Sequence, residues 1–117
     1  MISSTLGEAV NFNHNSLTSI TIITTDGSGA DTVNINSVDG NFSSNLTVTA
    51  GTDDTINTGT VDIGSGALDL TGGQVNVNGA FTTTGSVDID STFGNIHFAA
   101  AGSIDAGTSE IDLTAAS

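Results

Sequence analysis

The sequence predicts an all-β protein folded as a parallel β-helix, a three-faced β-solenoid of about five coils with roughly 20 to 24 residues each. Short units that alternate apolar, polar and apolar residues recur along the chain, and Gly, Ser, Asn or Asp usually separates them. No segment has the period of a helix. The chain also lacks proline, which a central strand excludes because proline has no backbone N–H to donate.

The alternating units mark the expected strands. In chain order, the clear units begin at Val33, Leu46, Val61, Leu68, Val75, Val87, Ile96, Ile104 and Ile111. Weaker copies begin at Val10, Ile56 and Phe81. A period of two buries every second side chain of a strand, so each unit is expected to contribute its apolar residues to a narrow core. The chain has five Phe and neither Trp nor Tyr, so this core is expected to be thin.

Every third unit belongs to one of three series, and each series is expected to form one face of stacked parallel strands. The steps within a series run from 19 to 25 residues. The first series is Val10, Val33, Ile56, Val75 and Ile96; the second is Leu17, Phe42, Val61, Phe81 and Ile104; the third is Ile22, Leu46, Leu68, Val87 and Ile111.

The polar residues inside two of these series support the stacking. In the first series they are Asn11, Asn34, Asn57, Asn76 and His97. Stacked Asn side chains can hydrogen-bond along a ladder, so a recurring Asn favours this register. In the third series the corresponding residues include Asp69, Asp88 and Asp112.

A chain of 117 residues is expected to form a single domain across residues 1–117, with residues 1–16 as an N-terminal cap or docking segment. The alternative fold is an antiparallel β-sandwich, whose strands also recur every 8 to 12 residues or so. The short, similar units and the scarcity of large core residues favour the solenoid.

The charge of the chain excludes several classes of partner. It has 13 acidic residues and neither Lys nor Arg, for a net charge of −13. Nucleic acids and anionic membrane surfaces are therefore not expected partners, because both require cationic side chains. No stretch approaches the roughly 20 apolar residues of a membrane span, so no membrane insertion is expected. Residues 1–15 lack the positive region and the long apolar run of a secretory signal.

Two groups of aspartates are candidate calcium ligands. The stretch TTDGSGADTVNIN, residues 24–36, resembles the calcium loop of the repeats-in-toxin family at Gly27, Gly29, Asp31 and Val33. Asp54 aligns with Asp31 one coil later, and Asp26 and Asp53 lie near them in sequence, so the four carboxylates form one candidate site. A solvated corner without an ion is the alternative. Asp69, Asp88 and Asp112 form a weaker second candidate, and its alternative is an acidic stripe that keeps the protein soluble.

No enzyme is expected. His14 and His97 stand far apart, and no Cys or second His lies at metal-binding spacing. Neither a nucleophile motif nor a phosphate-binding loop occurs, and nothing singles out a catalytic pair among the 13 acids.

Two stretches resemble known repeats. Residues 66–116, which begin GALDLTGGQVNVNGAFTTTGSVDID, resemble the β-helical repeats of filamentous-haemagglutinin-like and autotransporter-type bacterial surface proteins. Residues 29–59 are similar to Asp- and Asn-rich coils of very large secreted bacterial proteins. The resemblance implies a right-handed parallel β-helix that serves as a stalk, adhesin shaft or matrix component.

The expected function is therefore structural or adhesive, in a bacterial cell surface or an extracellular fibre. The expected partner is a second copy joined end to end, or flanking repeats of the same parent chain. The alternative function is a calcium- or glycan-binding module of a secreted protein, with calcium as the cofactor. The expected location is extracellular or at the cell surface.

Overall fold

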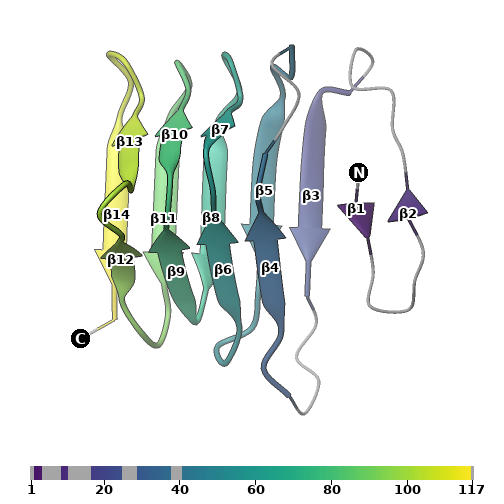
Figure 1. Cartoon of the computed structure of the whole chain (residues 1–117), viewed down its shortest axis with the longest axis vertical. Helices are drawn as coiled ribbons and strands as arrows, with labels where there is room; N and C mark the ends of the chain where they lie inside the picture. Colours follow the sequence, from purple (N-terminus) through teal and green to yellow (C-terminus); the bar gives the residue numbers. More distant parts are fainter. Residues whose placement is uncertain (1, 4–8, 11–16, 25–28, 38–40, 117) are drawn as a thin grey trace.

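The computed structural model of the chain describes residues 2–3, 9–10, 17–24, 29–37 and 41–116. The chain winds into a β-solenoid whose coils lie side by side from the N-terminal end to the C-terminal end (Figure 1). Three parallel sheets form its walls, and the described residues contain no helix. The parallel pairing confirms the predicted β-helix and excludes the antiparallel sandwich.

Neighbouring strands of each wall come from successive coils. The five-stranded sheet contains β3 (Ser19–Ile23), β5 (Asn45–Thr49), β8 (Leu68–Gly72), β11 (Val87–Ser91) and β14 (Ile111–Ala115). The four-stranded sheet contains β4 (Thr32–Ile35), β6 (Thr55–Thr58), β9 (Gln74–Val77) and β12 (Ile96–Phe98). The three-stranded sheet contains β7 (Val61–Asp62), β10 (Ala80–Thr82) and β13 (Ser103–Asp105). A separate antiparallel pair, β1 (Ile2–Ser3) and β2 (Ala9–Val10), lies beyond β3 at the N-terminal end (Figure 1).

Most of the predicted register is confirmed. In the four-stranded sheet, Val33, Ile56, Val75 and Ile96 are partners in successive strands. In the three-stranded sheet the partners are Val61, Phe81 and Ile104. In the five-stranded sheet they are Leu46, Leu68, Val87 and Ile111.

The predictions are wrong in the first coil. Val10 pairs antiparallel with Ile2 rather than parallel with Val33. Two segments separated by a short connection can pair as a hairpin, whereas parallel pairing needs a longer crossover. Leu17 and Phe42 lie outside the strands, so the second series has only three rungs. The expected five coils are thus complete only in the five-stranded sheet.

The third series is displaced by two residues at its first rung. Leu46 pairs with Ile20, and Ile22 pairs with Val48. A shift of two residues keeps the same side chains on the inner face, so the alternating pattern of β3 could not distinguish the two registers.

The core is a narrow column of aliphatic side chains between the three walls. Phe81 is its one fully buried aromatic residue among those described. The other large apolar side chains that are fully buried are Ile56, Ile63, Leu68, Leu70, Ile89, Val48, Val61, Val75, Val77 and Val87. The thin core expected from the composition is confirmed.

Hydroxyl groups fasten neighbouring coils at the corners. Ser44 Oγ donates to the carbonyl oxygen of Leu17 at 2.6 Å, and Ser91 Oγ donates to that of Gly73 at 2.9 Å. Thr83 Oγ1 donates to the carbonyl oxygen of Gly66 and accepts from Gly85 N at 3.0 Å. These buried hydroxyls satisfy main-chain groups that leave the strand ladders where the chain turns.

Glycine serves the corners in two ways. Gly64 and Gly107 have positive φ angles of 58° and 59°, and each N–H donates to the aspartate two residues earlier, Asp62 or Asp105. Gly66 instead lies so close to the preceding coil that a Cβ there would overlap the carbonyl group of Ser44. Close approach between coils is therefore a second reason for glycine besides backbone conformation.

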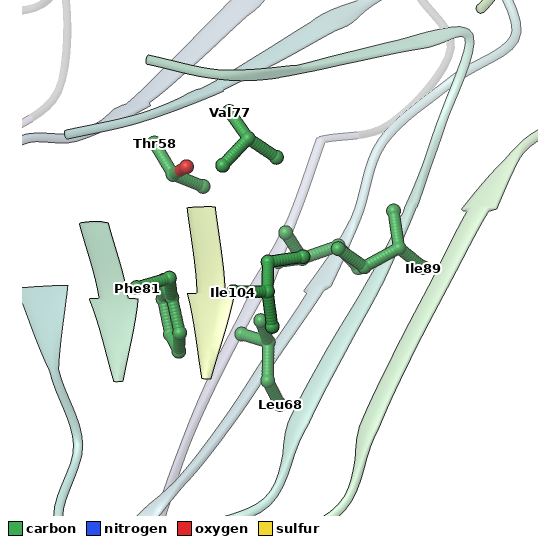
Figure 2. Close-up of a pocket in the computed structure, with 7 residues that line it drawn as sticks. Thr58, Leu68, Val77, Phe81, Ile89 and Ile104 are labelled. Atoms are coloured by element: carbon green, nitrogen blue, oxygen red, sulfur yellow. The ribbon is translucent and has the colours of Figure 1, made fainter. Parts of the chain in front are cut away.

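Thr58 is the exception among the buried hydroxyls. Its side chain is 1% exposed, and among the described residues its Oγ1 is the one buried side-chain polar atom without a hydrogen-bond partner. The residue stands between Ile35 and Val77 in the four-stranded sheet. Figure 2 shows the narrow gap beside it, which has no room for a water molecule and is lined by Thr58, Leu68, Leu70, Val77, Phe81, Ile89 and Ile104.

We expect Thr58→Val to stabilise the protein by about 1 kcal/mol, because valine has the same shape and removes a hydroxyl that is buried without a partner. Thr83→Val is the matched control. It should destabilise the protein by about 1 to 3 kcal/mol, since the Thr83 hydroxyl is hydrogen-bonded. Urea denaturation of both variants measures the two changes, and equal destabilisation would contradict this account of Thr58.

Candidate functional site

The predicted calcium corner is organised around the buried carboxylate of Asp54, which is 2% exposed. Its Oδ2 accepts from Thr24 Oγ1 at 2.7 Å and from Gly51 N at 2.8 Å. Its Oδ1 accepts from Asp31 N at 2.7 Å. The hydrogen bond from the Thr24 hydroxyl, followed by those from the N–H groups of Asp31 and Gly51, lowers the pKa of Asp54 although burial opposes this. Asp54 thus binds one coil to the coil before it.

Of the other three predicted ligands, the two described ones, Asp31 and Asp53, do not join Asp54 through their side chains. Asp31 and Asp53 are exposed, and Asp26 lies outside the described residues. Within the described ranges, no group of three or more His, Asp or Glu side chains is placed to hold a metal ion. The predicted proximity of Asp31 and Asp54 is present, but the backbone of Asp31 makes the contact. Calcium binding at this corner stays a prediction.

The second predicted group forms an exposed acidic ladder. Asp69, Asp88 and Asp112 are partners in successive strands of the five-stranded sheet, as the register predicted. Loss of water contact raises the pKa of Asp88, and the negative charges of Asp90, Asp69, Asp112 and Glu110 raise it further. Like charges stacked one coil apart therefore oppose the fold at neutral pH.

A ladder of amides runs along the four-stranded sheet. Asn57 Nδ2 donates to Asn34 Oδ1 at 2.9 Å, and Asn76 Nδ2 donates to Asn57 Oδ1 at 2.8 Å. Gln74 Nε2 donates to Asn76 Oδ1 at 2.8 Å. His97 pairs with Asn76 in the next strand and is exposed, as expected for a surface position. Asn11, the predicted first member, lies outside the described residues.

The C-terminal coil exposes side chains at positions that are core positions one coil earlier. Ile111 and Leu113 are 42% and 43% exposed, whereas their partners Val87 and Ile89 are each 1% exposed. Phe98 is 41% exposed, and its partner Val77 is 1% exposed. The sequence placed strand units at Ile96 and Ile111, and the exposed fractions depend on whether a further coil covers them, which none does among the described residues.

No family model, curated protein or solved structure matches this chain. The β-solenoid architecture therefore rests on the strand pairing described above. None of the described residues belongs to a helix that could span a membrane.

Asp54→Asn is expected to lower the urea midpoint at pH 7 more than Asp53→Asn does, because Asp53 is exposed and Asn cannot accept all three hydrogen bonds. The lowered pKa means that folded Asp54 binds fewer protons than unfolded Asp54. Its contribution is therefore present above the unfolded pKa, 3.8, and is lost as the pH falls from there through the folded pKa.

Urea midpoints measured from pH 7 down to below 3.8 test this sign. The difference between the wild type and Asp54→Asn should narrow on the acid side. A difference that stays constant over the whole range would contradict the role of the ionised carboxylate.

Asp88→Asn is expected to raise the melting temperature at neutral pH and low salt. The raised pKa means that ionised Asp88 opposes folding, and this penalty disappears as the pH falls through its folded pKa. The gain should shrink in high salt, which screens the repulsion. Asp62→Asn is the control and should not stabilise, because Asp62 accepts a hydrogen bond from Gly64 N.

A calcium titration distinguishes two effects on the ladder of Asp69, Asp88 and Asp112: general screening of its charges by salt, and specific binding of calcium. If calcium binds there, millimolar calcium chloride should raise the melting temperature of the wild type more than sodium chloride of equal ionic strength. Asp88→Asn should lose that difference. Equal effects of the two salts would count against calcium as a ligand.

Proposed function

We propose that this chain is a structural segment of a bacterial cell surface or extracellular fibre, in which another β-coil covers its C-terminal coil. The observation that carries the proposal is the exposure of core positions in that coil: Phe98, Ile111 and Leu113 are 41 to 43% exposed. Under this proposal the chain has no catalytic role. The bacterial setting is supported by the resemblance of residues 66–116 to the repeats of bacterial surface proteins.

The chemistry of this end suits a further coil. Among the described strands, the last one of each wall, β12, β13 or β14, has one edge without a strand partner. Such an edge presents backbone N–H and C=O groups that pair readily with another strand. A covering coil would satisfy these groups and remove the exposed apolar side chains from water. The coil would come from a second copy joined end to end or from flanking repeats of the same parent chain.

Charge favours a head-to-tail joint between copies. One outward column of the five-stranded sheet reads Thr21, Thr47, Asp69, Asp88 and Asp112 from its N-terminal to its C-terminal strand. Contact between two C-terminal ends would bring two acidic ends together. Contact between a C-terminal and an N-terminal end would instead place the acids near the end that contains β1, β2 and β3, strands without a charged residue. Head-to-tail contact along the direction of coil stacking leaves a free end on each outer copy and therefore yields an open fibre.

Leu113→Asp tests the proposal. The wild type should sediment as larger species as its concentration rises, and electron microscopy should show elongated particles. A charge at position 113 would have to enter the joint without a partner, so the variant should associate at least tenfold more weakly, which corresponds to about 1.4 kcal/mol.

Thr114→Asp is the matched control, because it adds the same charge to β14 in a column that faces outward beside Asp90. It should weaken association less than Leu113→Asp. Far-UV circular dichroism shows whether both variants keep the β fold. A compact monomer at every concentration, or equal effects of the two substitutions, would refute an apolar joint at this end.

A further inference from the structure

One outward face of the solenoid is uncharged although the chain has a net charge of −13. We call it the amide face, and it consists of the outward positions of the four-stranded sheet: Thr32, Asn34, Thr55, Asn57, Gln74, Asn76 and His97. These positions contain no carboxylate. The outward positions of the five-stranded sheet include Asp69, Asp88, Asp90 and Asp112, and those of the three-stranded sheet include Asp62 and Asp105.

The amides of this face are already ordered. Asn34, Asn57 and Asn76 are joined by hydrogen bonds of 2.8 to 2.9 Å, and Gln74 donates to the last of them. Binding of a partner would therefore cause these side chains to lose little additional rotamer entropy. Each donating amide nitrogen has two N–H groups and uses one of them within the ladder. No described residue accepts from the second N–H, which can therefore donate to a group outside the sheet.

We infer that the amide face pairs two copies of this chain laterally, face to face. An amide donates and accepts, so an array of amides and hydroxyls is complementary to a second copy of itself. Facing sheets joined by such side chains are the arrangement of cross-β zippers. Charge selects this face, because contact through either of the other two walls would bring carboxylates of both copies together without a cation between them. The contact goes beyond the end-to-end joint and leaves both ends free.

The charges along the two borders of the amide face favour one relative orientation of the two copies. The corners that precede β4 and β6 carry the exposed Asp31 and Asp53, whereas the corners that follow β4 and β9 carry the exposed Asn36 and Asn78. A two-fold axis parallel to the direction of coil stacking makes the facing strands antiparallel. The border with Asp31 and Asp53 in one copy then lies against the border with Asn36 and Asn78 in the other. This is an isologous contact, and it places β6 of one copy opposite β6 of its partner.

Sedimentation equilibrium in the Leu113→Asp background tests the inference without end-to-end growth. That chain should still form dimers in 150 mM sodium chloride. Adding Asn57→Asp, which puts a charge at the centre of the amide face, should weaken the dimer at least tenfold. Adding Thr47→Asp, which puts the same charge on the five-stranded sheet, should leave the dimer unchanged. Monomers at all concentrations, or equal weakening by both substitutions, would overturn the inference.

Cross-linking provides a second test that does not disturb the amide ladder, because the natural chain has no cysteine. Thr55→Cys lies on β6, one of the two inner strands of the four-stranded sheet, and Thr82→Cys is its control on β10 of the three-stranded sheet. A short bis-maleimide should link Thr55→Cys into dimers and leave Thr82→Cys monomeric, whereas equal yields would contradict the pairing. If the amide face instead bound cellohexaose while the chain stayed monomeric, a glycan and not a second copy would be its partner, and the inference would be wrong.

Discussion

Backbone hydrogen bonds between parallel strands of successive coils hold this chain together. Leu46 N donates to the carbonyl oxygen of Ala67, and Leu68 N donates to that of Ser86, each at 2.9 Å. The bonds recur in all three walls, so each coil depends on its neighbours for the pairing of its backbone. Because the core is thin, each coil needs its neighbour both to pair its backbone and to bury its Val, Ile and Leu side chains. A coil that lost its neighbour would expose both its edge and its apolar side chains.

Stacking in register also gives each outward side chain the same kind of neighbour again and again. For the amides this is favourable, since Asn34, Asn57 and Asn76 donate and accept along the ladder. For the carboxylates of Asp69, Asp88 and Asp112 it is unfavourable, and the raised pKa of Asp88 reflects the accumulated loss of solvation and repulsion. One geometric rule therefore creates a neutral wall and an acidic wall on the same small solenoid.

The buried polar groups show how the corners are held in register. Asp54 accepts hydrogen bonds from donors in two coils, and the Thr83 hydroxyl is hydrogen-bonded to both Gly66 and Gly85. Such groups replace the main-chain bonds that are lost where the chain turns between walls. Asp54 illustrates that an aspartate in a glycine-rich corner can be a structural hydrogen-bond acceptor as well as a candidate ligand for a cation.

The sequence by itself determined the all-β class, the parallel stacking of every third unit and the rungs of the later coils. Side-chain alternation and coil length suffice for these because they repeat, and repetition makes the Val33, Ile56, Val75 and Ile96 rungs recognisable without any contact map. The tertiary structure alone decided the first coil, where Val10 joins an antiparallel pair and Ile20 rather than Ile22 meets Leu46. Shifts of two residues preserve the alternating pattern, so only packing separates them. The same holds for the candidate sites: spacing brought Asp31 and Asp54 together, but three-dimensional packing buried Asp54 and left Asp31 and Asp53 exposed. Burial and hydrogen bonding depend on which coil covers a residue, and neither is encoded in the spacing of its own segment.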